Sequence, residues 1–558
     1  MEKLIIKNGL VYDPMNNVEG EIKDILIEKG KIVEKFTNQN DVQEIDAKSK
    51  TIIPSALEIH AHIASQQTNW ARLLGIRNEM FNNVWNGLSL DYISKSYISN
   101  GYTFILEANV YPSLAKQTIF NFNQIPVLDK AMLLNVSNFW PLELEFQRGK
   151  IDDMAMFLSE LLSITKAFGF KAYNPFEAED WDFKSVRTDL SKNGRLYNFS
   201  ALDVYENLTR VNEHLGMPHS IHAHIEGYET SQAKDNLITL LEQIKSLKLD
   251  VNSQTSSSIK RTQILHLAHA SAYNIDGNNK KFIEFMNNNQ DFDLDLGFVG
   301  FDELNPLITS DRRLIHKFLD TNSTEIPSGL ITSAVETEGD SFINLRSFDK
   351  NNEVDCRIWG NAIELALNIK NKWQLQFSVN FPNYAHINDI PEIIAWLVSN
   401  EARTQFMKDM NQDFIANNSL NANDTCLTFN EVVIISRASP AKSLGLGNIK
   451  GNLGLNADAD LNIINIDAKE MDFSKDIDKL KNAFSNIEYV IKSGEIIKQQ
   501  DNYNLAPQGR ILWSEGKVDK TNLKSIMTKK EEFYSKFGST FYDALKVSVK
   551  SKHLRQII

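Results

Sequence analysis

The run "ALEIHAHIAS" (residues 56–65) places two histidines, His60 and His62, at the end of a short apolar segment. Residues i and i+2 of a β-strand point to the same side of a sheet, so both imidazoles can face one site. Imidazole is a common zinc ligand. The pair alone is a weak signal, because two ordinary histidines in a half-buried strand would look the same.

Seven more short apolar runs follow this one and alternate with segments of helical periodicity. The eight runs cover residues 51–63, 102–110, 131–137, 168–175, 219–225, 263–271, 291–297 and 375–382. Helices are expected at 153–167, 203–215, 234–247 and 311–319. Eight strands alternating with helices predict an α/β fold, a (β/α)8 barrel. The long interval before the last strand predicts an insertion.

Both ends of the chain have a different sequence pattern, in which apolar residues alternate with polar ones around Gly-containing turns. Four stretches share it, residues 3–11, 24–35, 451–466 and 487–498. They predict a small β-sandwich domain formed from both termini. The expected organisation is therefore an N-terminal part of the sandwich at 1–51, the (β/α)8 barrel at 52–440, and the rest of the sandwich with a terminal extension at 441–558.

Composition excludes several classes of protein. The net charge of −13 argues against nucleic acid or an anionic membrane surface as a partner. No apolar run approaches the roughly 18–20 residues of a membrane span, and the N-terminal residues do not form a signal peptide, so a cytoplasmic protein is expected. The only two cysteines, Cys356 and Cys426, exclude a disulfide framework, a cysteine-based zinc site and a cysteine-ligated iron–sulfur cluster within the chain.

The histidines gather where a barrel builds its active site. His60, His222 and His266 lie towards the C-terminal ends of the first, fifth and sixth predicted strands, with His62 and His224 two residues beyond. In a barrel these ends share one face, which carries the catalytic residues. The joint pattern favours a metal site over histidines that only pack in the core.

Lys171, in "FGFKAYNP" (168–175), lies within the fourth predicted strand. A lysine inside a barrel strand is costly unless it is paired or modified. It is either a carboxylated lysine whose carbamate bridges two metal ions, or a lysine that pairs with a carboxylate or reaches the surface.

Together these features resemble the amidohydrolase superfamily. Within it they are most similar to the A-type subunit of formylmethanofuran dehydrogenase and its bacterial counterpart in the formyltransferase/hydrolase complex, and the resemblance runs nearly end to end. The segments that carry it are "EIHAHIA" (58–64), "GYTFILEA" (101–108), "GFKAYNP" (169–175), "VNEHLGMPHSIHAH" (211–224), "WGNAIELAL" (359–367), "PEIIAWLVSNEAR" (391–403) and "SRASPAKSLGLGNIKGNLGLNADADLNI" (436–463).

The resemblance implies a binuclear zinc site that hydrolyses, or forms, the formyl amide of a methanofuran-type C1 carrier and releases formate. The implied ligands are His60 and His62 for the first ion, carboxylated Lys171 as the bridge, and His222 and His266 for the second, with His224 as the alternative on the fifth strand. The implied partners are the B- and C-type subunits of formylmethanofuran dehydrogenase together with a formyltransferase subunit. No organic cofactor is implied.

The end of strand eight departs from the family, which reads Thr-Asp-His-Pro-Asn there. This chain reads "SVNFPN" (378–383), so Asn380 takes the position of the general-base Asp and Phe381 that of the His. An amide cannot act as a general base near neutral pH. The segments 222–230 and 64–75 also depart from the family, and all three lie at the barrel mouth.

These departures keep three functions open. The chain is the hydrolytic subunit of the C1-carrier complex, or a degenerate, non-catalytic scaffold subunit of the same complex, or an amidohydrolase that acts on another amide such as a cyclic amide.

Overall fold

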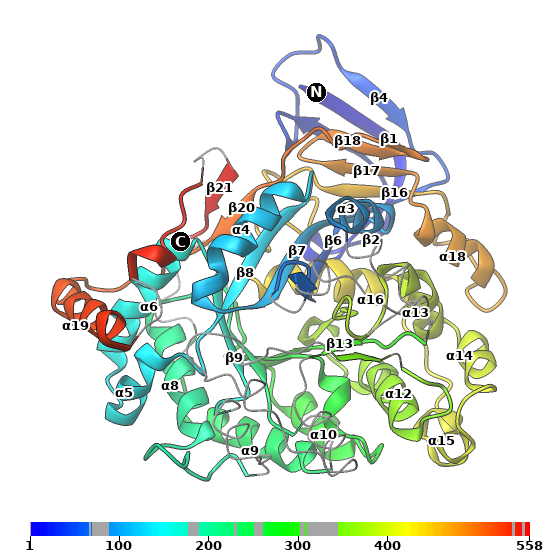
Figure 1. Ribbon diagram of the computed structural model, residues 1–558. Coiled ribbons are helices and arrows are strands. Elements are labelled where there is room, and N and C mark those ends of the chain that lie inside the picture. The colour runs from blue at the N-terminus through cyan, green and yellow to red at the C-terminus, as the bar shows by residue number, and fades with distance from the viewer. Residues whose placement is uncertain are drawn as a thin grey trace.

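The described residues form two large β-sheets and one two-stranded sheet, and helices surround the larger of the two large sheets (Figure 1). The computed structural model describes residues 2–65, 68–69, 89–176, 189–227, 231–249, 251, 261–301, 307–309, 344–346, 348–537, 542–549 and 553–558. The larger, ten-stranded sheet contains the barrel, and the smaller sheet has nine strands from both terminal regions.

Eight parallel strands build the barrel. They are β6 (Ala56–Ala61), β7 (Tyr102–Val110), β8 (Asp129–Asn135), β9 (Gly169–Tyr173), β10 (Ile221–His224), β11 (Leu265–Leu267), β12 (Phe292–Asp295) and β15 (Leu375–Gln376). Each lies within, or within two residues of, one of the eight predicted runs, so the predicted α/β barrel is confirmed. Their runs are nearly continuously apolar because the strands are buried on both faces.

The two ends of the barrel sheet meet just beyond β15. The Ser378 hydroxyl donates a hydrogen bond to the carbonyl of His60 at 3.1 Å. The backbone N–H of His62 donates to the carbonyl of Phe381 at 2.7 Å. These contacts place the segment after strand eight beside strand one, and the sheet is nearly closed.

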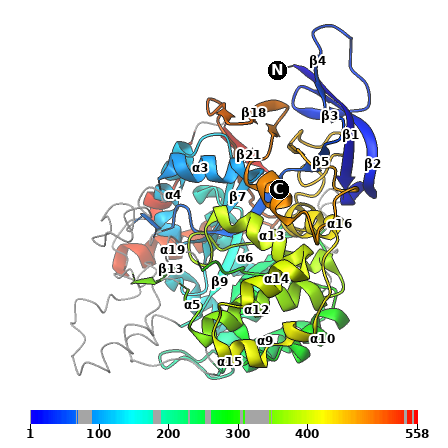
Figure 2. The same ribbon diagram turned by 90° about the vertical axis from the view of Figure 1, so that its right-hand side faces the viewer.

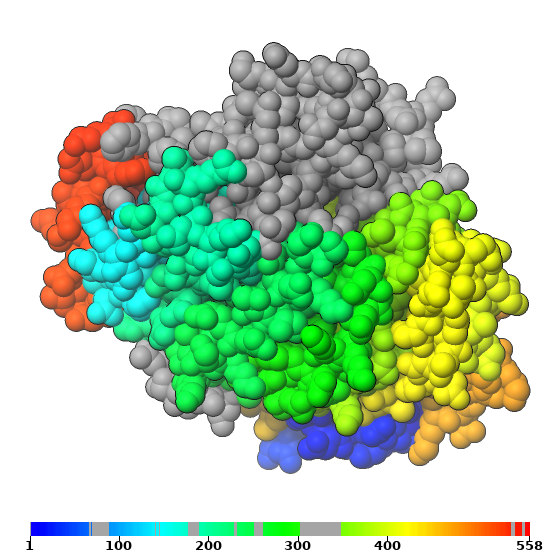
Figure 3. Space-filling view, turned by 90° about the horizontal axis from the view of Figure 1, so that it is seen from below, coloured from blue at the N-terminus to red at the C-terminus, as the bar shows by residue number. Residues whose placement is uncertain are grey.

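Helices follow the strands around the outside of the barrel. The first of them are α3 (Leu90–Ser99), α4 (Ala115–Gln124), α5 (Trp140–Arg148), α6 (Ile151–Thr165), α8 (Ala201–His214), α9 (Ala233–Ser246) and α10 (Lys280–Asn288). Three of the four predicted helices correspond to α6, α8 and α9, and the fourth, at 311–319, lies outside the described residues. In Figure 3 the described surface changes colour in chain order from cyan through green to yellow, as expected when each helix follows its strand.

The predicted insertion falls between β12 and β15. Its described part contains the antiparallel pair β13 (Leu307–Thr309) and β14 (Asn344–Arg346), followed by α12 (Glu353–Asn368). A helical region then follows strand eight, seen at the front of Figure 2. It comprises α13 (Ile390–Val398), α14 (Asn400–Met407), α15 (Gln412–Asn417), α16 (Phe429–Val433), a π-helical turn (Ile434–Ala438) and α17 (Ser439–Ser443).

The nine-stranded sheet joins the two terminal regions. Its strands are β1 (Lys3–Asp13), β2 (Val18–Glu28), β3 (Lys31–Val33), β4 (Gln43–Asp46), β5 (Thr51–Pro54), β16 (Leu461–Ile464), β17 (Tyr489–Lys492), β18 (Glu495–Gln499) and β19 (Asn502–Tyr503). The antiparallel pair β5 and β16 links its N- and C-terminal halves. The predicted small β domain formed from both termini is thus confirmed, while its exact residue boundaries stay a prediction.

The last strands of the chain extend the barrel sheet instead. β20 (Ile511–Trp513) pairs with β8, and β21 (Leu554–Gln556) pairs with β20. Two further helices, α18 (Ile477–Ser485) and α19 (Leu523–Phe537), lie on the outside (Figure 1). Among the described residues, no helix has the length and apolar character needed to span a membrane.

Candidate metal centre

Strand register brings the candidate ligands to one level of the barrel. His222 on β10 pairs in register with Lys171 on β9 and with His266 on β11. His266 pairs in register with Asp293 on β12. Side chains in register on adjacent parallel strands share a face, so these four residues line the barrel interior together.

Three atoms from three strands converge on one point. His60 Nδ1 lies 3.0 Å from Asp295 Oδ2 and 3.0 Å from His222 Nε2, and His222 Nε2 lies 3.7 Å from Asp295 Oδ2. All three side chains are buried. A tetrahedral ion bound at roughly 2.0–2.1 Å has ligand atoms about 3.3–3.4 Å apart. The three separations bracket this spacing, so the group fits one metal ion.

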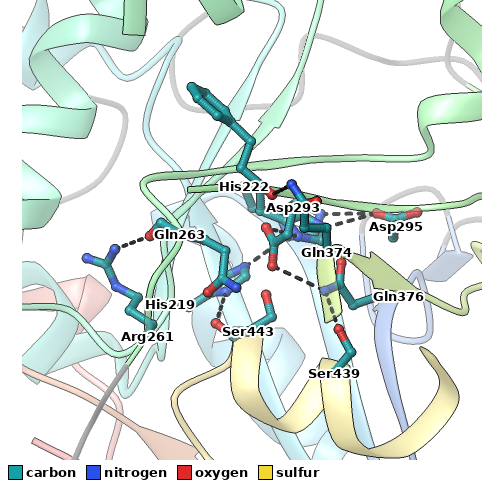
Figure 4. A network of polar contacts seen from close by, with 12 residues as sticks. His219, His222, Arg261, Gln263, Asp293, Asp295, Gln374, Gln376, Ser439 and Ser443 are labelled. Atoms are coloured by element: carbon teal, nitrogen blue, oxygen red, sulfur yellow. Dashed lines mark hydrogen bonds and ion pairs between the residues drawn. The ribbon is translucent and has the colours of Figure 1, made fainter. Parts of the chain in front are cut away.

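A chain of hydrogen bonds fixes the tautomer of His222. The Ser443 carbonyl, which can only accept, lies 2.9 Å from His219 Nδ1, and that nitrogen therefore donates. Burial lowers the pKa of His219 to about 3, so its Nε2 is unprotonated and accepts from His222 Nδ1 at 3.2 Å. The lone pair of His222 Nε2 then faces His60 and Asp295. Figure 4 shows this arrangement of Ser443, His219, His222 and Asp295.

His266 lies between two carboxylates. Its Nδ1 is 3.0 Å from Asp293 Oδ1, and its Nε2 is 3.3 Å from Asp295 Oδ2. Burial alone would lower the pKa of His266, but the two carboxylates outweigh it and raise the pKa to about 9. A carboxylate on the far nitrogen of a histidine is the usual outer-shell arrangement at a metal site. His266 is therefore oriented towards the same point as Asp295.

A second pair of atoms lies towards the mouth. His62 Nδ1 is 3.4 Å from Glu107 Oε1, yet in the part of the chain that the structure describes neither atom has a hydrogen-bond partner. Glu107 is anchored by its other oxygen, which accepts from the backbone N–H of Ala64 at 2.6 Å. Buried polar atoms without partners are costly. A cation between the imidazole and the carboxylate would satisfy both.

Lys171 is buried near both groups. Burial lowers its pKa to about 7, and the carboxylates of Asp295 and Glu107 offset only part of that effect. The lowered pKa favours the unprotonated amine relative to an exposed lysine. The unprotonated amine is the form that can add carbon dioxide to give a carbamate, so the environment of Lys171 fits the bridging role.

Asn380 and His224 lie outside these groups. Asn380 follows β15, is buried and has a left-handed backbone (φ 44°), and its N–H donates to the Ser378 hydroxyl. No hydrogen bond or ion pair within the described ranges joins its side chain to a histidine. His224 Nδ1 lies 2.8 Å from Asn174 Oδ1, and its ring packs 4.6 Å from that of His269.

The structure groups the candidate ligands only partly as the resemblance does. The resemblance pairs His60 with His62, and His222 with His266. The geometry keeps His222 with His266, in a group that also contains His219, and it further groups His60 with His222 and Asp295, and His62 with Glu107.

Several site residues were not predicted. They are Glu107, His219, Asp293 and Asp295. The signal for two of them was present, because "DFDLDLG" (291–297) repeats an acidic residue at alternate positions of a buried strand. The i, i+2 rule that selects His60 and His62 selects Asp293 and Asp295 equally well.

Comparison with known proteins agrees with this architecture. A model of the amidohydrolase family matches residues 361–498. Protein FwdA of Methanocaldococcus jannaschii is 28% identical over 98% of this chain and 96% of its own length. The A-type subunit of the formyltransferase/hydrolase complex Fhc of Methylorubrum extorquens is 24% identical over 96% of this chain and 94% of its own.

The fold has a close counterpart among solved structures. A chain in the crystal structure of the formyltransferase/hydrolase complex FhcABCD from Methylorubrum extorquens, determined with methylofuran, superposes with a TM-score of 0.84. The match covers 100% of this chain and 99% of that one at 22% identity, which speaks for the fold. The resemblance inferred from the sequence is therefore confirmed: the chain is similar over nearly its whole length to FwdA and to the A-type subunit of Fhc, and it has an amidohydrolase-type fold.

Proposed function

We propose that this chain is the hydrolytic, A-type subunit of a complex of the formyltransferase/hydrolase or formylmethanofuran dehydrogenase type. It hydrolyses or forms the formyl amide of a methanofuran-type carrier with two zinc ions. The observation that carries the proposal is the convergence of His60, His222 and Asp295 at tetrahedral spacing inside a barrel of this type. The end-to-end similarity to FwdA and to the A-type subunit of Fhc supports the substrate class.

Each group of the chain has a defined task in this proposal. His60 and His222, with His266 beside them, hold one ion, and His62 with Glu107 holds the other. Lys171, in its carboxylated form, lies between the two. Bound zinc acidifies water and polarises a carbonyl oxygen, which is the chemistry that formamide hydrolysis requires. His219 keeps the Nε2 lone pair of His222 directed at its ion.

The expected partners follow from the relatives. The relative from Methylorubrum extorquens is named as part of a formyltransferase/hydrolase complex, and FhcABCD was solved with methylofuran. We therefore expect this chain to assemble with B- and C-type subunits, together with a formyltransferase subunit. We expect the carrier to enter at the barrel mouth, where the side chain of His62 is 15% exposed.

The test is metal content and formate release by the assembled complex. The natural complex should hold about two zinc ions per chain and release formate from the formyl carrier, and His60→Ala should lower the zinc content by about one ion and abolish formate release. His214→Ala is the matched control, because His214 lies at the end of α8, outside the barrel, and contacts Asp152 at 3.7 Å. A zinc-free complex, or normal formate release by His60→Ala, would contradict the proposal.

A non-catalytic scaffold is the second candidate, and Asn380 is the observation that favours it. If the natural complex releases no formate while Asn380→Asp gains activity, the chain is a degenerate subunit. If the natural complex is active, the scaffold role is excluded.

A further inference from the structure

The barrel contains a carboxylate where strand seven ends, one strand away from Asn380. Asp295 is the last residue of β12, and its side chain is completely buried. Its Oδ2 lies within 3.7 Å of nitrogen atoms from His60, His222 and His266. The side chain of Asn380 has no hydrogen bond to any of these histidines in the described ranges.

The loops after strands six and seven meet around this carboxylate. Asp295 Oδ1 accepts from the backbone N–H of His269 at 2.9 Å. His269 adopts a left-handed conformation (φ 32°), which costs a non-glycine residue roughly 1–2 kcal/mol. A Cβ at Gly297 would lie 2.5 Å from the Cβ of His269, so only glycine fits there. One oxygen is thus fixed by the backbone, and the other is directed at the histidines.

Three ligand atoms from three strands converge at this point. His60 Nδ1 lies 3.0 Å from both Asp295 Oδ2 and His222 Nε2. A ring nitrogen carries at most one proton, so His60 Nδ1 can donate to only one of these two atoms at a time. A divalent cation would bind all three atoms at once.

We propose that Asp295 is the carboxylate ligand of the ion held by His60 and His222, and that it supplies from strand seven the carboxylate that strand eight lacks. This inference rests on the proposed function and extends it to a residue on a different strand. It explains how a chain with an amide at position 380 keeps a negatively charged ligand at its metal centre.

The first test measures zinc in the full complex. Asp295→Asn should reduce the content from about two zinc ions per chain to about one and weaken binding of the lost ion by at least about 100-fold in chelator competition. Asp293→Asn is the matched control. Among the histidines that the structure describes, the Asp293 carboxylate contacts only His266, at Nδ1, the nitrogen that faces away from Asp295. Both ions should therefore remain in Asp293→Asn, with zinc affinity reduced roughly 10- to 100-fold.

A second variant detects ligation directly. In the cobalt(II)-substituted complex, Asp295→Cys should add a thiolate-to-cobalt charge-transfer band in the near ultraviolet, which a residue outside the coordination shell would not produce. The natural chain should lack this band, because its only cysteines are Cys356 and Cys426. This readout is independent of activity.

The outcomes separate the inference from the function it rests on. If the natural complex holds no zinc, the proposed function fails. If the natural complex holds two zinc ions while Asp295→Asn keeps both at unchanged affinity and Asp295→Cys shows no charge-transfer band, only the role of Asp295 fails. Gain of a zinc ion by Asn380→Asp over the natural chain would also overturn the inference.

Discussion

Two clusters of buried charges lie at opposite ends of the barrel strands, and each contains a lysine that is 1% exposed. The histidine cluster (His60, His222, His266 and Asp295, with Lys171 beside them) lies at the C-terminal ends. The lysine cluster contains Lys450, Asp129, Asp458 and Asp460. Asp129 begins β8, whereas Asn135 at its other end pairs with Lys171, so about 20 Å of strand separates the clusters.

The pKa values of Lys450 and Lys171 are shifted in opposite directions. Lys450 Nζ lies 2.7 Å from both Asp129 and Asp460, and these carboxylates outweigh burial and hold its pKa well above the ordinary value. Burial instead lowers the pKa of Lys171 to about 7. Three carboxylates also converge at the lysine cluster, but the ammonium of Lys450 already supplies their cation.

The comparison distinguishes a cluster that stabilises the fold, the lysine cluster, from one that is suited to metal binding, the histidine cluster. The lysine cluster joins Asp129 of β8 to Lys492 of β17 at 2.8 Å and Asp458 to Arg555 of β21 at 2.5 Å, so it fastens both sheets and the last strand together. Its charges are balanced within the protein. The histidine cluster instead gathers two imidazole nitrogens and a carboxylate oxygen within 3.7 Å of one another, which is an arrangement that can bind an external cation.

The largest expected effect is on stability. Lys450→Met removes the buried cation that Asp129, Asp458 and Asp460 share, which should lower the free energy of unfolding by about 3–5 kcal/mol. Urea denaturation of the chain, with metal removed by a chelator, measures this loss of free energy. Lys171→Met is the matched control and should change the free energy of unfolding by less than about 1 kcal/mol, because its burial already disfavours the charged form. Equal losses in the two variants would show that the two lysines play the same structural role.

The next effect is on catalysis. Lys171→Met should lower formate release from the formyl carrier by roughly 10²–10³-fold, on the order of 3–4 kcal/mol of activation free energy, because the proposed carbamate bridge between the two ions would be lost. Carbon-13 NMR of protein equilibrated with labelled carbon dioxide should show a carbamate signal in the natural chain but none in this variant. A carbamate signal that persists in Lys171→Met would locate the modification elsewhere.

The smallest effect concerns orientation within the histidine cluster. His219→Leu removes the acceptor for His222 Nδ1, and zinc affinity should fall roughly 10- to 100-fold while stability is little changed. His219→Gln can still donate to the Ser443 carbonyl and accept from His222, so it should recover most of the affinity. Competition with a zinc chelator measures both variants. If leucine and glutamine have the same effect, His219 only fills space.

The strands and their order could be predicted from the sequence because each barrel strand is buried on both faces and reads as an apolar run. The same logic located His60, Lys171, His222 and His266, since it needs only their places along each strand. Which of them share an ion depends on how strand one meets the segment after strand eight. That contact, between His62 and Phe381, joins residues 319 positions apart and leaves no periodic signal.

The carboxylates were missed for a related reason. Asp295 lies in a run with acidic residues at alternate positions, and Glu107 is the only acidic residue of its run. Neither pattern shows whether the carboxylate meets a metal ion or a lysine. The position of Asn380 at the mouth follows from Pro382 and Asn383 in register. Only the structure shows the left-handed turn at His269, whose backbone N–H holds the carboxylate of Asp295 on the neighbouring strand seven.

The acceptor that orients His219 is a main-chain carbonyl at the end of α17, one of the last four of a helix, which have no partner within it. Because every residue type carries this carbonyl, Ser443 can be exchanged for another small residue without loss of the signal that sets the proton on His222. Position 219 has no such freedom, since it must donate with one atom and accept with another. Among related sequences, variation should therefore be tolerated at 443 and restricted to residues such as histidine or glutamine at 219, although the two positions serve the same hydrogen-bond chain.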